Sequence, residues 1–155
     1  MSSPTIALPP WIGVALLSCV TGAAFFKGGR PERIAAGGIT LGVLAGFAMR
    51  DRHWSGTQWA DFAIDLIFFL LILAIALRSD RYWPIWAAGF QLLAVITHAA
   101  SLIDAGLAPW AYVTAGVIWT YLVMGALAVG TYEAWRGAHP AISGAPAAAA
   151  GETRR

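Results

Sequence analysis

The sequence predicts an all-α integral membrane protein, a bundle of five transmembrane helices with its N-terminus outside and its C-terminus inside. Three observations lead to this prediction. Of the 155 residues, 59% are hydrophobic and only 12% are charged, with a mean hydropathy of +0.67, whereas soluble domains carry about twice that charge. Five apolar segments are each about as long as a helix that crosses a bilayer. Lysine and arginine gather in alternate connections between those segments, as the positive-inside rule requires.

The first two expected spans cover residues 7-26 and 34-50. The first is uncharged throughout, and the residues before it contain no lysine or arginine. A secretory signal peptide begins with a basic region, so we expect a retained helix here. A tight charged turn, residues 27–33, is expected between the two spans.

The remaining spans are expected at 61-78, 83-103 and 107-131. Pro84 falls in the first turn of the fourth helix, where a missing backbone N–H costs nothing. Residues 66–73 are apolar without alternation, which favours a helix because the strands of a membrane barrel alternate apolar and polar residues. Residues 1-136 thus form one predicted transmembrane domain, and the Gly/Ala/Pro-rich segment 137-155 is expected to be a disordered cytoplasmic tail.

Charge asymmetry orients the predicted bundle. With five spans, one side holds only Arg50 and Arg52, and the other holds Lys27, Arg30, Arg33, Arg78, Arg81, Arg136, Arg154 and Arg155. The richer side is expected to face the cell interior, in a bacterial-type inner membrane with the lipid bilayer as the main partner. Trp83 is among the aromatic residues expected at the inner headgroup level, where amphipathic rings prefer to lie.

Glycines at a spacing of four mark one face of the second helix. Gly38, Gly42 and Gly46 lie one above another on that face, where two helix backbones can approach closely. One interpretation is close packing inside a single bundle. The other is an interface with a second copy of the chain or with a partner membrane subunit.

Ionisable residues recur on the outer half of the third and fourth helices. Asp61 and Asp65 are four residues apart and share a face, with Asp65 about 6 Å deeper in the membrane at 1.5 Å per residue. His98 lies about 9 Å below the outer end of the antiparallel fourth helix. Asp65 and His98 are therefore expected at similar depth in one leaflet.

Gln91, His98 and Ser101 form a polar stripe on the fourth helix, and Asp104 follows at its outer end. Ionisable groups inside a membrane are costly and mark functional sites by default. We consider three alternatives for Asp65 and His98: a hydrogen bond that ties two helices together, a proton relay or cation site, and no contact at all. Spacing fixes their depth but not which helix faces meet.

Other kinds of chemistry have little support in the sequence. The small net charge of +2 without a basic cluster argues against nucleic-acid binding, and one cysteine excludes a disulfide framework. His98 is the only histidine in a predicted span, which disfavours a haem with two axial histidines. His53 and the nearby acids match no metal-ligand spacing, and no nucleophile motif occurs. We therefore expect no metal, no cofactor and no enzymatic activity.

Two hypotheses for the function remain. The first is a small accessory or structural membrane protein that packs or assembles through its small-residue helix faces. The second is a small transport or proton-coupled protein that uses Asp61, Asp65, Gln91, His98, Ser101 and Asp104. A membrane enzyme ranks third.

Overall fold

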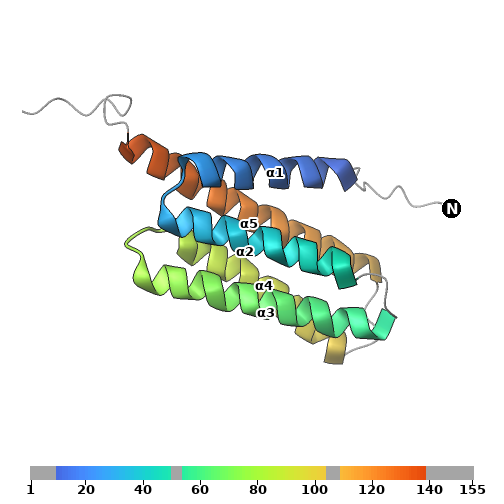
Figure 1. The fold of residues 1–155 in the computed structure, drawn as a ribbon. Coiled ribbons are helices and arrows are strands. Elements are labelled where there is room, and N and C mark those ends of the chain that lie inside the picture. Colours follow the sequence, from blue (N-terminus) through green and yellow to red (C-terminus); the bar gives the residue numbers. More distant parts are fainter. Residues whose placement is uncertain (1–9, 50–53, 104–108, 139–155) are drawn as a thin grey trace, which may run out of the picture.

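The computed structural model describes residues 10–49, 54–103 and 109–138, and within these ranges it contains five α-helices and no strand (Figure 1). The helices are α1 (Pro10–Lys27), α2 (Arg30–Met49), α3 (Trp54–Arg78), α4 (Trp83–Ile103) and α5 (Pro109–Ala138). The predicted all-α fold and the number of helices are thus confirmed. Residues 1–9, 50–53, 104–108 and 139–155, which include His53, Asp104 and most of the expected tail, lie outside the description.

Four of the helices form a ring, and the fifth lies outside it. α3 packs on α2 and α4, α4 packs on α5, and contacts between α2 and α5 close the ring. α1 touches only α2 and α5 among the described helices. Figure 1 shows successive helices running in opposite directions along the bundle, so that α1, α3 and α5 end where α2 and α4 begin.

Two helices begin earlier than the sequence pattern predicts. Only Gly28 and Gly29 separate α1 from α2, so residues 30–33 form the first turn of α2 and the expected turn over 27–33 is wrong. Because this segment is rich in charged residues, the sequence pattern does not reveal that a helix starts in it. Pro31 suits the start of a helix, because a proline in the first turn loses no helical hydrogen bond. α3 starts at Trp54, before the expected start of the third span at residue 61.

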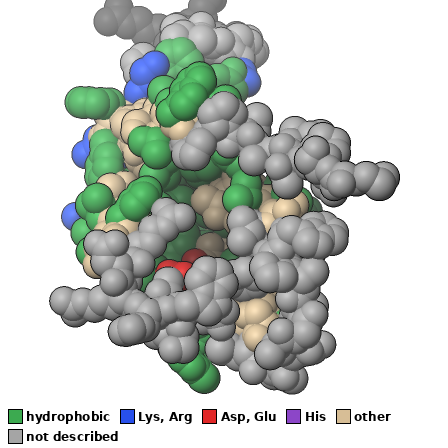
Figure 2. Space-filling view, turned by 90° about the vertical axis from the view of Figure 1, so that its right-hand side faces the viewer, with side chains coloured by type: hydrophobic (Ala, Val, Ile, Leu, Met, Phe, Trp, Pro, Cys, Tyr) green, Lys and Arg blue, Asp and Glu red, His purple; other side chains and the backbone are tan. Residues whose placement is uncertain are grey.

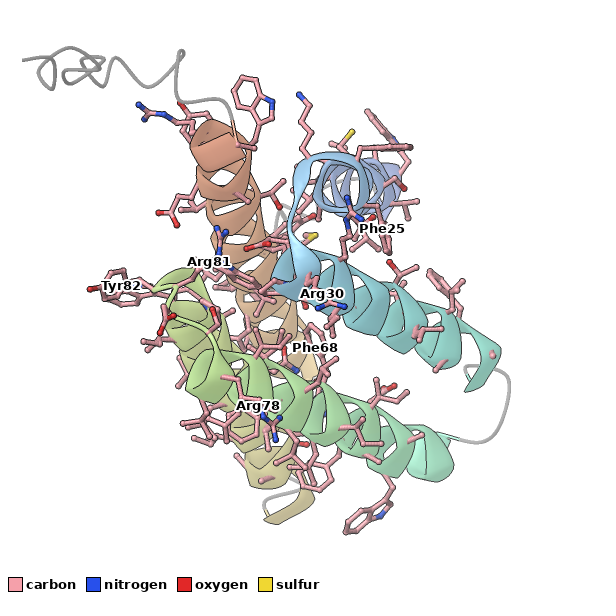
Figure 3. All side chains as sticks on the ribbon, turned by 60° about the vertical axis from the view of Figure 1, so that its left-hand side comes forward. Phe25, Arg30, Phe68, Arg78, Arg81 and Tyr82 are labelled. Atoms are coloured by element: carbon pink, nitrogen blue, oxygen red, sulfur yellow. The ribbon has the colours of Figure 1, made fainter. Side chains whose placement is uncertain are left out.

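One end of the bundle, which we call the basic end, carries every lysine and arginine of the described ranges. These are Lys27, Arg30, Arg33, Arg78, Arg81 and Arg136. Three of them, labelled in Figure 3, lie where α2 begins, where α3 ends and just before α4. The opposite end is called the open end below.

The buried hydrophobic core lies mainly in the half of the bundle nearest the basic end. Its members are Ala24, Ala35, Ala36, Ile39, Phe68, Ile72, Ile75, Trp83, Ala87, Ala88, Val123, Met124 and Leu127. Alanine dominates on α2 and α4, which lets the helix axes approach closely. Phe68, labelled in Figure 3, lies between the helices at the edge of this core. The bundle is therefore tightly packed toward the basic end.

Glu32 and Trp83 hold the basic end together, and neither role was predicted. Glu32 is fully buried; its Oε2 accepts the N–H of Gly29 at 2.8 Å, and its Oε1 accepts the indole N–H of Trp83 at 2.8 Å. Arg81 lies 3.6 Å from the same Oε1. Glu32 thus caps α2 and ties it to α4. Trp83 is only 2% exposed, so its ring faces the interior of the bundle.

Two described helices are long and apolar enough to cross a membrane by length and composition. They are Trp59–Arg78, with a mean hydropathy of 2.5, and Thr114–Ala138, with a mean hydropathy of 1.5. Only 11% of the apolar window of the first is buried inside the bundle. The core helix of a soluble protein would be mostly buried, so this low value is weak support for contact with lipid.

Candidate functional site

A cavity of about 290 Å³ lies between α2, α3, α4 and α5 toward the open end. Its wall on α2 is thin, because Gly42 and Gly46 contribute no side chain there. Figure 2 looks onto the open end and shows acidic side chains, in red, in a hollow whose visible wall includes hydrophobic side chains. The cavity begins where the tight packing of the other half stops, with Ile39, Phe68 and Val123 belonging to both.

Asp65 and His98 are in direct contact in this cavity. His98 Nε2 lies 2.7 Å from Asp65 Oδ2, which joins α3 to α4. The amide of Gln91 donates to the other carboxylate oxygen, Oδ1, at 2.9 Å and also approaches the backbone carbonyl of Asp65 at 3.3 Å. Both oxygens of one carboxylate thus have a partner from α4, and the geometry excludes the alternative in which Asp65 and His98 do not meet.

Burial differs among the three side chains in a way that matters for access. Gln91 is 4% exposed, and the side chain of His98 is 14% exposed. The side chain of Asp65 is 30% exposed, so its carboxylate is the part of this group most accessible from the cavity. Gln91 holds one oxygen of the carboxylate, and Asp65 is the most exposed of the three side chains.

The other predicted polar residues lie in different places. Asp61 lines the cavity one helical turn nearer the open end than Asp65. Ser101 does not line it, and its hydroxyl donates to the backbone carbonyl of His98 at 2.8 Å. Asp104 lies outside the described residues. The structure therefore brings together Asp61, Asp65, Gln91 and His98, but leaves Ser101 out of the cavity wall.

Two threonines of the cavity were not predicted. Thr97 and Thr120 line it from α4 and α5. The indole N–H of Trp119 donates to the Thr97 hydroxyl at 3.1 Å, which links these two helices beside His98. The position of Trp119 in the middle of an apolar span could have indicated such a contact, because a buried indole N–H needs a hydrogen-bond partner.

The glycine face of α2 lies against α3 of the same chain. A Cβ atom added to Gly38 would lie 2.6 Å from Leu71 Cδ2 and 3.0 Å from the Phe68 ring. An added Cβ on Gly42 would be 3.3 Å from Ile64 Cγ2, and one on Gly46 would be 4.0 Å from Asp61 Oδ1. These glycines thus support packing within one chain, and α3 occupies the surface that a second copy would need.

Within the described ranges, no three His, Cys, Asp or Glu side chains lie close enough to hold a metal ion. No protein-family model matches the chain, and neither a similar curated protein nor a similar solved structure was found. The function is therefore inferred from the cavity and from the side chains that line it.

Proposed function

We propose that the chain is a small multi-pass membrane protein that binds a small polar solute in the open-end cavity and couples the movement of this solute to that of a proton. All five helices would cross a bacterial-type inner membrane, with the basic end toward the cell interior and the cavity open to the outside. The observation that carries this proposal is the contact of 2.7 Å between Asp65 and His98 inside a cavity of about 290 Å³.

The five-span arrangement is supported by the distribution of charge. The cations of the described ranges all lie at one end, as expected when positive residues stay in the cytoplasm. Large hydrophobic side chains are exposed along every helix, with Phe26, Leu41, Ile67, Ile96 and Val129 each more than half exposed. A soluble protein rarely leaves so much apolar surface in water, whereas lipid would cover it.

The cavity distinguishes a solute site from a simple hydrogen bond between helices. Protein interiors are normally packed with few voids larger than a water molecule. A hydrogen bond between Asp65 and His98 would be enough to hold α3 and α4 together. It would not require a cavity enclosed by four helices. The volume is close to the lower limit of about 300 Å³ for ligand pockets. Its size therefore suits a small solute.

Transport requires that the basic end open in a second conformation. In the structure, the core side chains close the path beyond Phe68, and Ile72 and Leu127 are almost completely buried there. An arrangement that is open on one side and closed on the other is one of the two states of alternating access. The accessory role predicted from the glycine face remains a prediction, and it would need a different surface because α3 covers that one.

Reconstitution tests the proposal. The purified chain is placed in phospholipid vesicles that contain a pH-sensitive dye, and small cationic, neutral and anionic solutes are added outside. We expect at least one solute to change the internal pH, and Asp65→Asn or His98→Gln to abolish the change. Asp80→Asn is the matched control, because Asp80 is exposed at the basic end and far from the cavity. The proposal would be contradicted if the change in internal pH persists in Asp65→Asn, or if no solute changes the internal pH.

A further inference from the structure

The charge of the cavity wall indicates which solutes the cavity accepts. Among the described residues of the wall, the titratable groups are Asp61 and Asp65 from α3 and His98 from α4. The wall residues from α2 and α5 are apolar, glycine or threonine, and the described wall contains no lysine or arginine. Two carboxylates and one imidazole favour a cation over an anion.

The open volume and the ligand count indicate what kind of cation fits. A bare metal ion would need several ligands, and the described residues hold no cluster of three. The cavity of about 290 Å³ also presents apolar side chains, Ile64, Phe68 and Val123, beside the carboxylates. A small organic ammonium ion matches both features, because its charged group pairs with a carboxylate while its carbon atoms contact the apolar wall.

Asp65 cannot hold two positive charges equally well. Its Oδ1 already accepts a hydrogen bond from Gln91, and its Oδ2 faces His98 Nε2. When His98 is protonated, the imidazolium neutralises the carboxylate. A second cation beside the same carboxylate would then be repelled by the imidazolium at short range, and in a poorly solvated cavity this repulsion is strong.

We infer that a small organic ammonium ion and the imidazolium of His98 compete for Asp65, so that each cation bound releases one proton. The ammonium pairs with Oδ2, the N–H bond at His98 Nε2 breaks, its electron pair stays on the nitrogen, and the proton leaves to water in the cavity. The total charge of the site is the same before and after the exchange. Gln91 keeps the carboxylate oriented throughout. This inference rests on the proposed function and specifies its solute and its coupling.

Proton counting on the full-length protein in detergent tests the exchange. n-Butylammonium chloride is titrated into a weakly buffered sample, with potassium chloride as the control for ionic strength. Binding is measured by calorimetry, and proton release with an indicator dye. We expect about one proton per cation bound for the unchanged protein and for Asp80→Asn. His98→Gln should bind the cation without releasing a proton, and Asp65→Asn should bind it at least tenfold more weakly.

A second measurement needs no variant. While His98 is protonated, one-for-one exchange requires the apparent dissociation constant to fall tenfold for each unit of rising pH, and at higher pH it should become constant. Binding with no proton release and no pH dependence would overturn the exchange. If n-butylammonium does not bind but a neutral or anionic solute drives proton movement in vesicles, the exchange is wrong and the proposed function stands. If no solute drives movement, the proposed function itself fails.

Discussion

Replacing Gly130 by alanine tests how tightly the basic end is packed. Gly130 lies on α5 directly against the indole of Trp83, and an added Cβ would overlap the ring atoms Cγ, Cδ1 and Nε1. The ring cannot easily move aside, because it is 2% exposed and its N–H donates to the buried Glu32 at 2.8 Å. Gly125, on the same helix, has no atom within 4 Å of the position where its Cβ would be added.

The expected magnitude follows from these contacts. Overpacking a filled site costs about 1–3 kcal/mol, and a shift of the ring would also weaken a hydrogen bond to a charged group, worth about 1.5–3 kcal/mol. Replacing glycine by alanine inside a helix stabilises the helix by about 1 kcal/mol. If the hydrogen bond is lost as well, these contributions together lower the free energy of unfolding of Gly130→Ala by about 1.5–5 kcal/mol. Gly125→Ala should leave it unchanged or raise it by up to about 1 kcal/mol.

Equilibrium unfolding of the purified chain in mixed detergent micelles measures both changes. A double-mutant cycle with Trp83→Ala isolates the cause, since the added methyl group should cost almost nothing once the indole is absent. The interpretation is refuted if Gly130→Ala is as stable as Gly125→Ala, or if its cost persists unchanged in the Trp83→Ala background.

Three further changes test other contacts in the same unfolding assay. Gly38→Ala should destabilise the chain by about 1–2 kcal/mol, since its Cβ would meet α3 side chains, whereas Gly37→Ala, with nothing within 4 Å, should not; equal effects would contradict the packing of that face. Trp83→Phe should cost about 1–3 kcal/mol, because a buried acceptor loses its donor, and an unchanged midpoint would show that the bond contributes nothing. Asp65→Asn and His98→Ala should be coupled by about 0.5–3 kcal/mol in a double-mutant cycle, and strictly additive effects would mean that the two side chains do not interact.

The sequence predicted the positions of the helices better than the directions that their side chains face. The fourth span was expected at 83-103, and α4 has these limits, because charged residues before it and an acid after it mark both ends. Similar depth for Asp65 and His98 followed from helix geometry alone, and the two side chains do touch. Depth depends only on the rise per residue, which every helix shares.

The faces could not be predicted because most spans are apolar all round. A helix without a polar side gives no periodic signal of which residues point inward. Glu32 lies in a run of charges that resembles an exposed turn, and its burial depends on the approach of Trp83 and Arg81 from a distant part of the chain. The neighbour of the glycine face could not be predicted either, because close packing leaves the same sequence pattern whether that neighbour is α3 or another chain.

The position of α1 outside the ring has a consequence for engineering the chain. The described residues of the cavity wall all come from α2 to α5, so α1 can be altered without changing any of them. At the basic end, α1 contacts α5 through Lys27, whose ammonium lies 5.0 Å from the centre of the aromatic ring of Trp135. A variant lacking α1 would begin and finish its helical part at one end of the molecule instead of at opposite ends. Because both ends of the helical part would then lie at the same end of the molecule, two fluorescent tags, one on each terminus, could report their proximity by energy transfer.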